Sequence, residues 1–147
     1  MFKIKQEIED FYVEEIPDIN IKEKGDYSYF ILEKKNWESN KVISAIASKL
    51  KIKVNRFNMA GIKDKRAVTK QYVSVYKIDK ELLEKINLKD IKIRFIGKGD
   101  ERLKLGQLKG NKFKIKVRDV EKKPKKILFL ENYFDEQRFS SQNYLIG

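Results

Sequence analysis

The 147-residue sequence contains no cysteine and no histidine, and it has only two prolines and one tryptophan. Without cysteine there can be no disulfide framework and no thiol nucleophile, and without either residue there can be no Cys/His zinc site and no Ser-His-Asp triad. Any catalysis must therefore use carboxylates, lysines, hydroxyls or amides. These absences exclude several large classes of enzyme.

Long apolar runs are also missing. No run approaches the roughly 18 residues that a membrane-spanning helix needs, and Met1–Asp10 lacks the apolar stretch of a signal peptide. Hydrophobic residues nevertheless make up 41% of the chain, which is too apolar for a disordered polycation. We therefore predict a folded cytoplasmic protein with no membrane partner, whose length fits one domain or part of a larger one.

The charge is strongly positive and unevenly distributed. The net charge is +12, but residues 1–30 carry four lysines against eight acidic residues, whereas residues 91–126 carry fourteen Lys and Arg against four acidic residues. A concentrated positive field favours phosphate-bearing partners, because each lysine near a polyanion releases counterions. A solvated lysine-rich surface is the alternative, and charge alone does not separate the two.

Hydrophobic periodicity predicts a mixed fold. Ser39 is a credible N-cap for a helix that ends near Leu50, since the apolar residues that follow it recur at three-and-four spacing. Strands are predicted over 11–16, 27–33, 71–78, 91–96 and 112–118, with a second helix over 79–87. In the last strand, Phe113, Ile115 and Val117 should face the core and the intervening cations should face solvent. We predict an α+β protein with a mainly antiparallel sheet and helices on one face, an arrangement common in RNA-binding folds.

Residues 59–71, Met-Ala-Gly-Ile-Lys-Asp-Lys-Arg-Ala-Val-Thr-Lys-Gln, show neither strand nor helix periodicity, and we expect a loop there. Asp64 is flanked by Lys63, Lys65 and Arg66. These cations would keep the carboxylate ionised, as a nucleophile or a base requires, and would attract phosphate. An isolated Lys-Asp-Lys is more often a solvated turn with a surface ion pair, so the spacing alone leaves the role of Asp64 open.

The whole string, however, resembles the signature of the TruD family of tRNA pseudouridine synthases. Four other blocks resemble motifs of that family in the same order along the chain. They are Glu9-Asp10-Phe11-x-Val13-x-Glu15, Leu32-Glu33-Lys34-Lys35-Asn36-Trp37, Leu105-Gly106-x-Leu108-x-Gly110-Asn111-x-Phe113 with Arg118, and Asn132-Tyr133-Phe134-x-x-Gln137-Arg138-Phe139. Five blocks spread over nearly the whole chain make the resemblance specific.

The resemblance implies isomerisation of uridine to pseudouridine, classically at position thirteen of tRNA, without cofactor or metal. The residue that matches Asp64 is the catalytic carboxylate of the family, acting either by covalent attack or by taking a sugar proton. In both cases the glycosidic bond breaks, the uracil turns in place, and C5 rejoins the sugar. The base must leave its stack to be reached, as in other enzymes that modify bases.

The resemblance also implies roles for other residues. Phe134 would support the flipped ring, Asn132 would hydrogen-bond near the catalytic carboxylate, and Lys5 would pair with Asp64. The substrate-binding set is predicted to be Lys5, Lys63, Gln71, Asn132, Phe134 and Arg138. The set that contacts the RNA backbone is predicted to be Lys65, Arg66, Lys112, Lys114, Lys116 and Arg118.

The chain departs from the family in two respects. Asp135 and Ser140 stand where the family usually has glycine, and neither residue has the backbone freedom of glycine. The family domain also continues well beyond this length and carries an inserted second domain. Residues 1–147 are therefore expected to form the N-terminal portion of a pseudouridine synthase catalytic domain, as a split-gene product or as a fragment. An unpartnered strand edge would then need a complementary C-terminal chain or self-association to cover it.

A non-catalytic RNA-binding module is the main alternative function. In that case the basic strand around Lys112–Arg118 and exposed aromatic residues would bind single-stranded or looped RNA, and Asp64 would only cap a turn. A basic ribosome-associated scaffold is a weaker alternative. Asp64 distinguishes the pseudouridine synthase from the RNA-binding module, because a binding module does not need a carboxylate in a loop that attracts phosphate.

Overall fold

A computed structural model describes residues 1–123 and 125–129 of the chain. These residues form six strands and two α-helices, together with 3₁₀ turns at Ile8–Asp10 and Val54–Arg56. The strands are β1 (Phe11–Pro17), β2 (Tyr27–Lys35), β3 (Phe57–Met59), β4 (Val68–Tyr76), β5 (Ile91–Gly99) and β6 (Leu108–Ile115), and the helices are α1 (Ser39–Leu50) and α2 (Lys80–Glu84).

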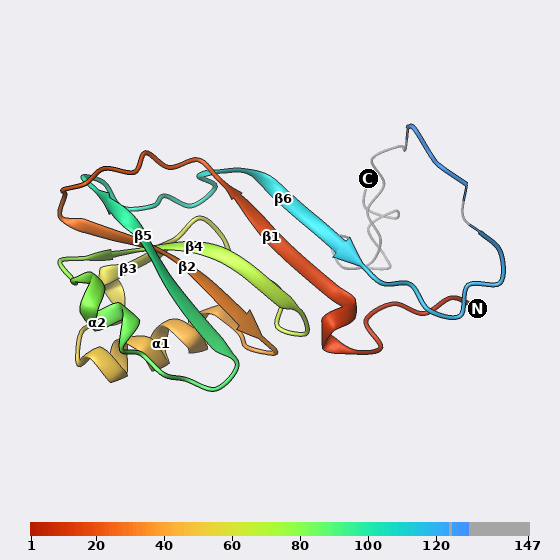
Figure 1. Ribbon diagram of the computed structural model, residues 1–147, viewed down its shortest axis with the longest axis horizontal. Helices are drawn as coiled ribbons and strands as arrows, with labels where there is room; N and C mark the ends of the chain where they lie inside the picture. The colour runs from red at the N-terminus through yellow and green to blue at the C-terminus, as the bar shows by residue number, and fades with distance from the viewer. Residues whose placement is uncertain (124, 130–147) are drawn as a thin grey trace, which may run out of the picture.

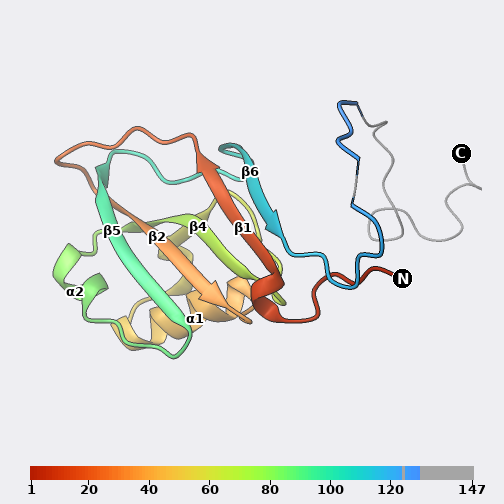
Figure 2. The ribbon, with the colours of Figure 1, turned by 45° about the vertical axis from the view of Figure 1, so that its right-hand side comes forward.

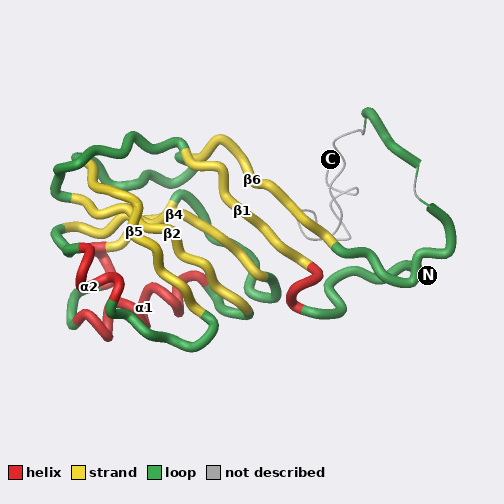
Figure 3. Tube along the Cα trace, viewed as in Figure 1, coloured by secondary structure: helices red, strands yellow, loops and turns green. Residues whose placement is uncertain are grey.

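The strands form one sheet in the order β5-β2-β4-β1-β6, and the short β3 also pairs with β4. Among the described strands, only the pairing of β1 with β4 is parallel. Both helices lie on one face of the β5-β2-β4 part of the sheet, while β1 and β6 extend away from them (Figures 1 and 3). The predicted α+β class, with a mainly antiparallel sheet and helices on one face, is confirmed. Within the described ranges, no helix is long and apolar enough to cross a membrane.

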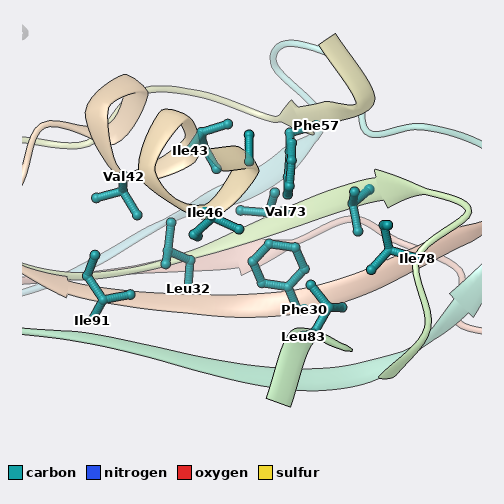
Figure 4. Close-up of a cluster of buried hydrophobic side chains, with 12 residues drawn as sticks. Phe30, Leu32, Val42, Ile43, Ile46, Phe57, Val73, Ile78, Leu83 and Ile91 are labelled. Atoms are coloured by element: carbon teal, nitrogen blue, oxygen red, sulfur yellow. The ribbon is translucent and has the colours of Figure 1, made fainter. Parts of the chain in front are cut away.

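The main core lies between the helices and this part of the sheet. Phe30 and Leu32 of β2 are fully buried beneath Val42 and Ile46 of α1 (Figure 4). The helix residues are four positions apart and the strand residues two apart, so each element places its apolar side chains on a single face. Each such side chain contributes about 1.5–3 kcal/mol on burial, which explains why this half of the fold follows the hydrophobic pattern closely.

A second, smaller cluster lies beside β1. Phe11 and Val13 of β1 are 9% and 4% exposed, and they share this cluster with fully buried Ala67. Ala67 is the last residue before β4. The apolar face of β1 therefore anchors the end of the segment in which we expect the catalytic loop.

The predicted loop over 59–71 is shorter in the structure, where only residues 60–67 lie between β3 and β4. The strand predicted to begin at Gln71 begins at Val68, and the three-residue β3 was not predicted because it is too short to show a period. The β3 strand pairs with Val73–Val75, whereas β1 pairs with Val68–Lys70 on the same edge of β4. The loop therefore leaves the sheet where β3 ends and rejoins it beside β1.

The prediction that Ser39 is the N-cap of α1 is wrong. Glu38 occupies the N-cap position without a side-chain cap bond, and Ser39 is the first helical residue. The buried Ser39 hydroxyl instead bonds to groups on the loop and on β4. The helix ends in the left-handed conformation of Lys51, whose φ is 56°.

The last strand also differs from its prediction. It covers Leu108–Ile115 rather than 112–118, and its expected core face is open, since Phe113, Ile115 and Val117 are 56%, 44% and 44% exposed. In the described part of the chain, β6 pairs only with β1, and the helices cover only the β5-β2-β4 part of the sheet. Beyond β6 the chain runs beside the N-terminal segment, to which it is joined by a bridge between Lys3 and Arg118 (Figure 2).

A row of alternating charges crosses the sheet. The pairing register places Glu14 of β1 between Lys112 of β6 and Lys70 of β4, and it places Glu33 of β2 between Lys70 and Lys92 of β5. Glu33 forms ion pairs with Lys70 and Lys92, each at 3.6 Å. Three lysines and two glutamates therefore alternate over five strands, and much of their charge is compensated within the row.

Candidate active site

Asp64 lies in the loop between β3 and β4, and its side chain is 40% exposed. Its Oδ2 atom lies 3.1 Å from Nζ of Lys5, although the two residues are 59 positions apart in the sequence. The structure thus contains the ion pair that the family resemblance implied. A charge-assisted bond of this kind fixes the direction of the carboxylate while leaving it accessible from solution.

Lys5 is itself held in place. Its ammonium lies 3.9 Å from the centroid of the Phe11 ring, a cation–π geometry. Its backbone has a φ of 54°, a conformation that is uncommon for non-glycine residues. Lys5 therefore approaches Asp64 from the N-terminal segment over the apolar face of β1.

Lys63 pairs with Glu15 rather than with the neighbouring Asp64. Its Nζ lies 2.9 Å from Oε1 of Glu15, and the two side chains are 8% and 1% exposed. The other oxygen of Glu15 accepts a hydrogen bond from the backbone N–H of Tyr72 at 2.8 Å. The predicted substrate-binding residue Lys63 is thus engaged in a buried ion pair that fastens the loop to β1.

The side chain of Gln71 also forms hydrogen bonds within the protein. Its side-chain amide donates to the carbonyl of Gly61 at 3.3 Å and accepts a hydrogen bond from the hydroxyl of Ser39 at 3.0 Å. The same hydroxyl accepts the backbone N–H of Lys63 at 3.2 Å. Gln71 and Ser39, from β4 and α1, therefore hold the first half of the loop.

Lys65 and Arg66 are the exposed cations next to Asp64. Arg66 donates one bond to the carbonyl of Gln6 at 3.1 Å, which ties the loop to the N-terminal segment near Lys5. The rest of its guanidinium and the Lys65 ammonium remain on the surface. Their placement beside the carboxylate is compatible with the predicted contact to an RNA backbone.

The predicted cations of the last strand fall into two groups. Lys112, Lys114 and Lys116 are exposed. Arg118 instead donates two hydrogen bonds to Asp10, at 2.7 and 2.8 Å. These bonds, with that from the Glu7 N–H, lower the pKa of Asp10 to about 2. Arg118 therefore joins the end of the basic segment to the N-terminal segment that carries Lys5.

A hollow of about 910 Å³ lies beside these cations. Its lining includes Lys114, Lys116 and Arg118, together with three acidic residues, Glu7, Glu9 and Asp10. Asp64 does not line it. The basic surface is consequently less uniform than the composition of residues 91–126 suggests.

Three predicted site residues, Asn132, Phe134 and Arg138, lie outside the described residues. Within the described ranges, no group of three or more acidic side chains is placed to hold a metal ion. Among the remaining predicted residues, Lys5 is paired with Asp64, and Lys63 and Gln71 hold the loop that carries Asp64.

Sequence reasoning missed two buried charges that belong to this set, Glu15 and Lys34. Glu15 occupies the inward position of β1 that follows Phe11 and Val13, and Lys34 is fully buried at the inward position of β2 that follows Leu32. The signal was present, because a charged residue in phase with a buried apolar face must be paired or hydrogen-bonded.

Comparison with known proteins identifies the family of the chain. The family model described as tRNA pseudouridine synthase D (TruD) matches residues 2–147. The chain is 42% identical to the Archaeoglobus fulgidus relative named tRNA pseudouridine synthase D, over 97% of this chain and 37% of the relative. It is 37% identical to the protein of that name from Aquifex aeolicus, over 95% of this chain and 40% of the relative.

A solved structure of the Methanosarcina mazei protein of the same name superposes with a TM-score of 0.80 at 38% identity, covering 82% of this chain and 28% of that one. The chain thus spans about two fifths of the length of its curated relatives. The match extends over nearly all of its own length and includes the loop that carries Asp64. The chain therefore belongs to the TruD family of tRNA pseudouridine synthases.

Proposed function

We propose that this chain carries the catalytic aspartate of a tRNA pseudouridine synthase and that Asp64 is the reacting carboxylate. One observation supports the proposal above the others. Asp64 is a partly exposed carboxylate on an irregular loop, and β1, β2, β4 and α1 all supply side chains that hold that loop in place. A turn that only joined two strands would not need so many buried polar contacts.

The proposed reaction is an isomerisation of uridine within tRNA, with position thirteen as the expected target. The N1–C1′ bond breaks, a C5–C1′ bond forms, the hydrogen on C5 is lost to solvent, and N1 takes up a proton. Asp64 acts as the nucleophile or as the base that starts this sequence, and either role requires the ionised form. Lys5, 3.1 Å away, supplies the positive charge that keeps the carboxylate oriented.

The tRNA is proposed to approach through phosphate contacts. Lys65 and Arg66 lie directly beside Asp64 and are exposed, and Lys112, Lys114 and Lys116 are exposed on and beside β6. These side chains can neutralise backbone phosphates without reading sequence. Base recognition would then depend on the pocket that receives the flipped uridine.

The test is release of tritium from tRNA labelled at C5 of uridine, since that hydrogen leaves when C5 bonds to the sugar. Asp64→Asn keeps the size of the side chain and should abolish release while retaining salt-sensitive tRNA binding. Asp18→Asn is the matched control, because Asp18 is exposed and far along the chain from the loop. Equal rates for wild type and Asp64→Asn would reject the catalytic assignment and leave the non-catalytic RNA-binding module as the better hypothesis.

A complementary segment is part of the proposal. In the described residues β6 pairs on one side only, and its residue Phe113 is 56% exposed. An edge and an apolar face of this kind favour a second chain or self-association. If the chain alone is inactive, fusion to the part of the A. fulgidus relative beyond the matched region should restore tritium release. A monodisperse monomer that is stable to heating and binds no hydrophobic dye would contradict this part.

A further inference from the structure

Lys34 is a fully buried lysine that the proposed reaction does not use. It lies on β2 in phase with Phe30 and Leu32, and 0% of its surface is exposed. A lysine is almost never buried to this extent unless its ammonium finds hydrogen-bond acceptors, because removing the charge from water is costly. The contacts of its Nζ atom therefore indicate its role.

The Lys34 ammonium donates to three backbone carbonyls. These are Trp37 at 2.7 Å, Asp64 at 2.8 Å and Lys63 at 3.4 Å. An ammonium has three donors and no acceptor, so its hydrogen-bonding capacity is used in full. The carbonyls of Lys63 and Asp64 belong to the two peptide groups on either side of the Asp64 Cα atom.

We infer that Lys34 is a positioning residue for Asp64, which fixes both peptide groups that flank the Asp64 Cα and thereby sets the direction of its side chain. The inference rests on the proposed function, because it takes Asp64 as the reacting carboxylate. Lys34 itself does not reach solvent and would not touch the RNA. With both flanking peptides held, the carboxylate can turn only about its own side-chain bonds, and Lys5 restricts those.

The charge state of Lys34 bears on this role. Burial lowers the pKa of Lys34 to about 8, while the nearby Asp64 carboxylate raises it and the Lys63 ammonium lowers it. The ammonium is charged at neutral pH and loses its proton in mildly alkaline solution. A neutral amine has only two donors, so one of the three carbonyls would then be released.

The first test compares Lys34→Met with Lys35→Met in the full chain. Methionine is unbranched and only one atom shorter than lysine, but it donates no hydrogen bond. Lys35 is the neighbouring lysine, which pairs with Glu9 instead of the loop. Amide hydrogen exchange over residues 61–67 should become at least tenfold faster in Lys34→Met and should not change in Lys35→Met. Unchanged exchange in this loop would overturn the inference.

A second measurement uses the wild-type chain and does not depend on how Lys34→Met folds. In an NMR titration with pH, the carbonyl carbon resonances of residues 37, 63 and 64 should shift with one common midpoint pH. That pH should equal the midpoint of the Lys34 side-chain nitrogen resonance. Carbonyl resonances that do not follow the Lys34 titration would overturn the inference.

Activity separates this inference from the proposed function. Lys34→Met should lower kcat for tritium release at least tenfold with little change in KM, as expected for a residue that orients a catalytic group. If Asp64→Asn is fully active while the loop still responds to Lys34→Met, the proposed function fails and the anchoring by Lys34 stands. If Asp64→Asn is inactive and Lys34→Met leaves both the loop and kcat unchanged, only the inference about Lys34 fails.

Discussion

The carboxylate of Glu15 lies 2.9 Å from the ammonium of Lys63, and both side chains are almost completely buried. Glu15 belongs to β1, and Lys63 immediately precedes Asp64. The pair therefore holds the loop that carries Asp64 on the sheet, in addition to the Asp64–Lys5 contact. Because neither charge can be solvated in place, each depends on the other.

Removing one partner of this pair should destabilise the fold. We expect Lys63→Met to lower the free energy of unfolding by about 3 kcal/mol, since Glu15 would remain as a buried unpaired charge. The double variant Lys63→Met with Glu15→Gln should lose less free energy of unfolding than the two single variants combined. Urea denaturation monitored by Trp37 fluorescence measures all three. Lys65→Met, an exposed neighbour, should stay within about 0.5 kcal/mol of wild type, and the same result for Lys63→Met would contradict the prediction.

Lys5→Met should lower the catalytic rate strongly while changing stability little. The Lys5–Asp64 pair is about one-third exposed, so its loss should cost less than about 1 kcal/mol of stability. The rate of tritium release should fall on the order of tenfold to a hundredfold, because a charge-assisted bond of about 1.5–3 kcal/mol no longer orients the carboxylate. Lys3→Met removes a nearby surface pair with Asp119 and serves as the control. A rate for Lys5→Met that matches Lys3→Met would argue against the pairing role.

The Asp10–Arg118 pair should make the free energy of unfolding depend on pH in the acidic range. The pKa of Asp10 is lowered from 3.8 to about 2, so the unfolded chain takes up a proton at this residue before the native chain does. The contribution of Asp10 is therefore complete above about pH 4 and is lost as the pH falls toward 2. Urea denaturation of wild type and Asp10→Asn over this range should show a stability difference that shrinks with acidification. A difference that stays constant down to pH 2 would be inconsistent with this pair.

The exposed lysines of β6 should contribute to tRNA binding through phosphate contacts. We expect Lys114→Met to weaken binding and to reduce the slope of log K against log salt by about 0.7–0.9, the change expected for one lost phosphate contact. Fluorescence anisotropy with labelled tRNA from 50 to about 200 mM salt measures the slope. Lys24→Met lies in the acidic N-terminal part of the sequence and should leave the slope unchanged. Equal slopes for the two variants would remove Lys114 from the proposed interface.

Much of the fold could be predicted from the sequence because periodic burial determines it. In α1, Val42 and Ile46 follow the helical period, and in β2, Phe30 and Leu32 follow the strand period, and these residues form the main core. The family resemblance implied that Lys5 pairs with Asp64. Periodicity could not have paired them, because it carries no information on residues 59 positions apart.

The features that could not be predicted depend on tertiary contacts. Glu15 and Lys34 were given no role in the site from the sequence, since only the folded chain brings Lys63 and the loop carbonyls to them. Phe113 was assigned to a core by strand alternation, but nothing in the local sequence shows whether a layer covers that face. Alternation predicts which side chains share a face, and it does not predict what lies opposite.

The row of alternating charges has a consequence for how the sheet assembles. A strand that slides by two residues keeps its buried side chains buried, so hydrophobic burial alone tolerates such a slip. If β4 slid by two residues in either direction, Val68 or Tyr72 would replace Lys70 between Glu14 and Glu33. Both glutamates would then lose the central lysine. The row therefore specifies the alignment of β4 with its neighbours, and because β4 follows the loop directly, that alignment fixes where Asp64 meets Lys5.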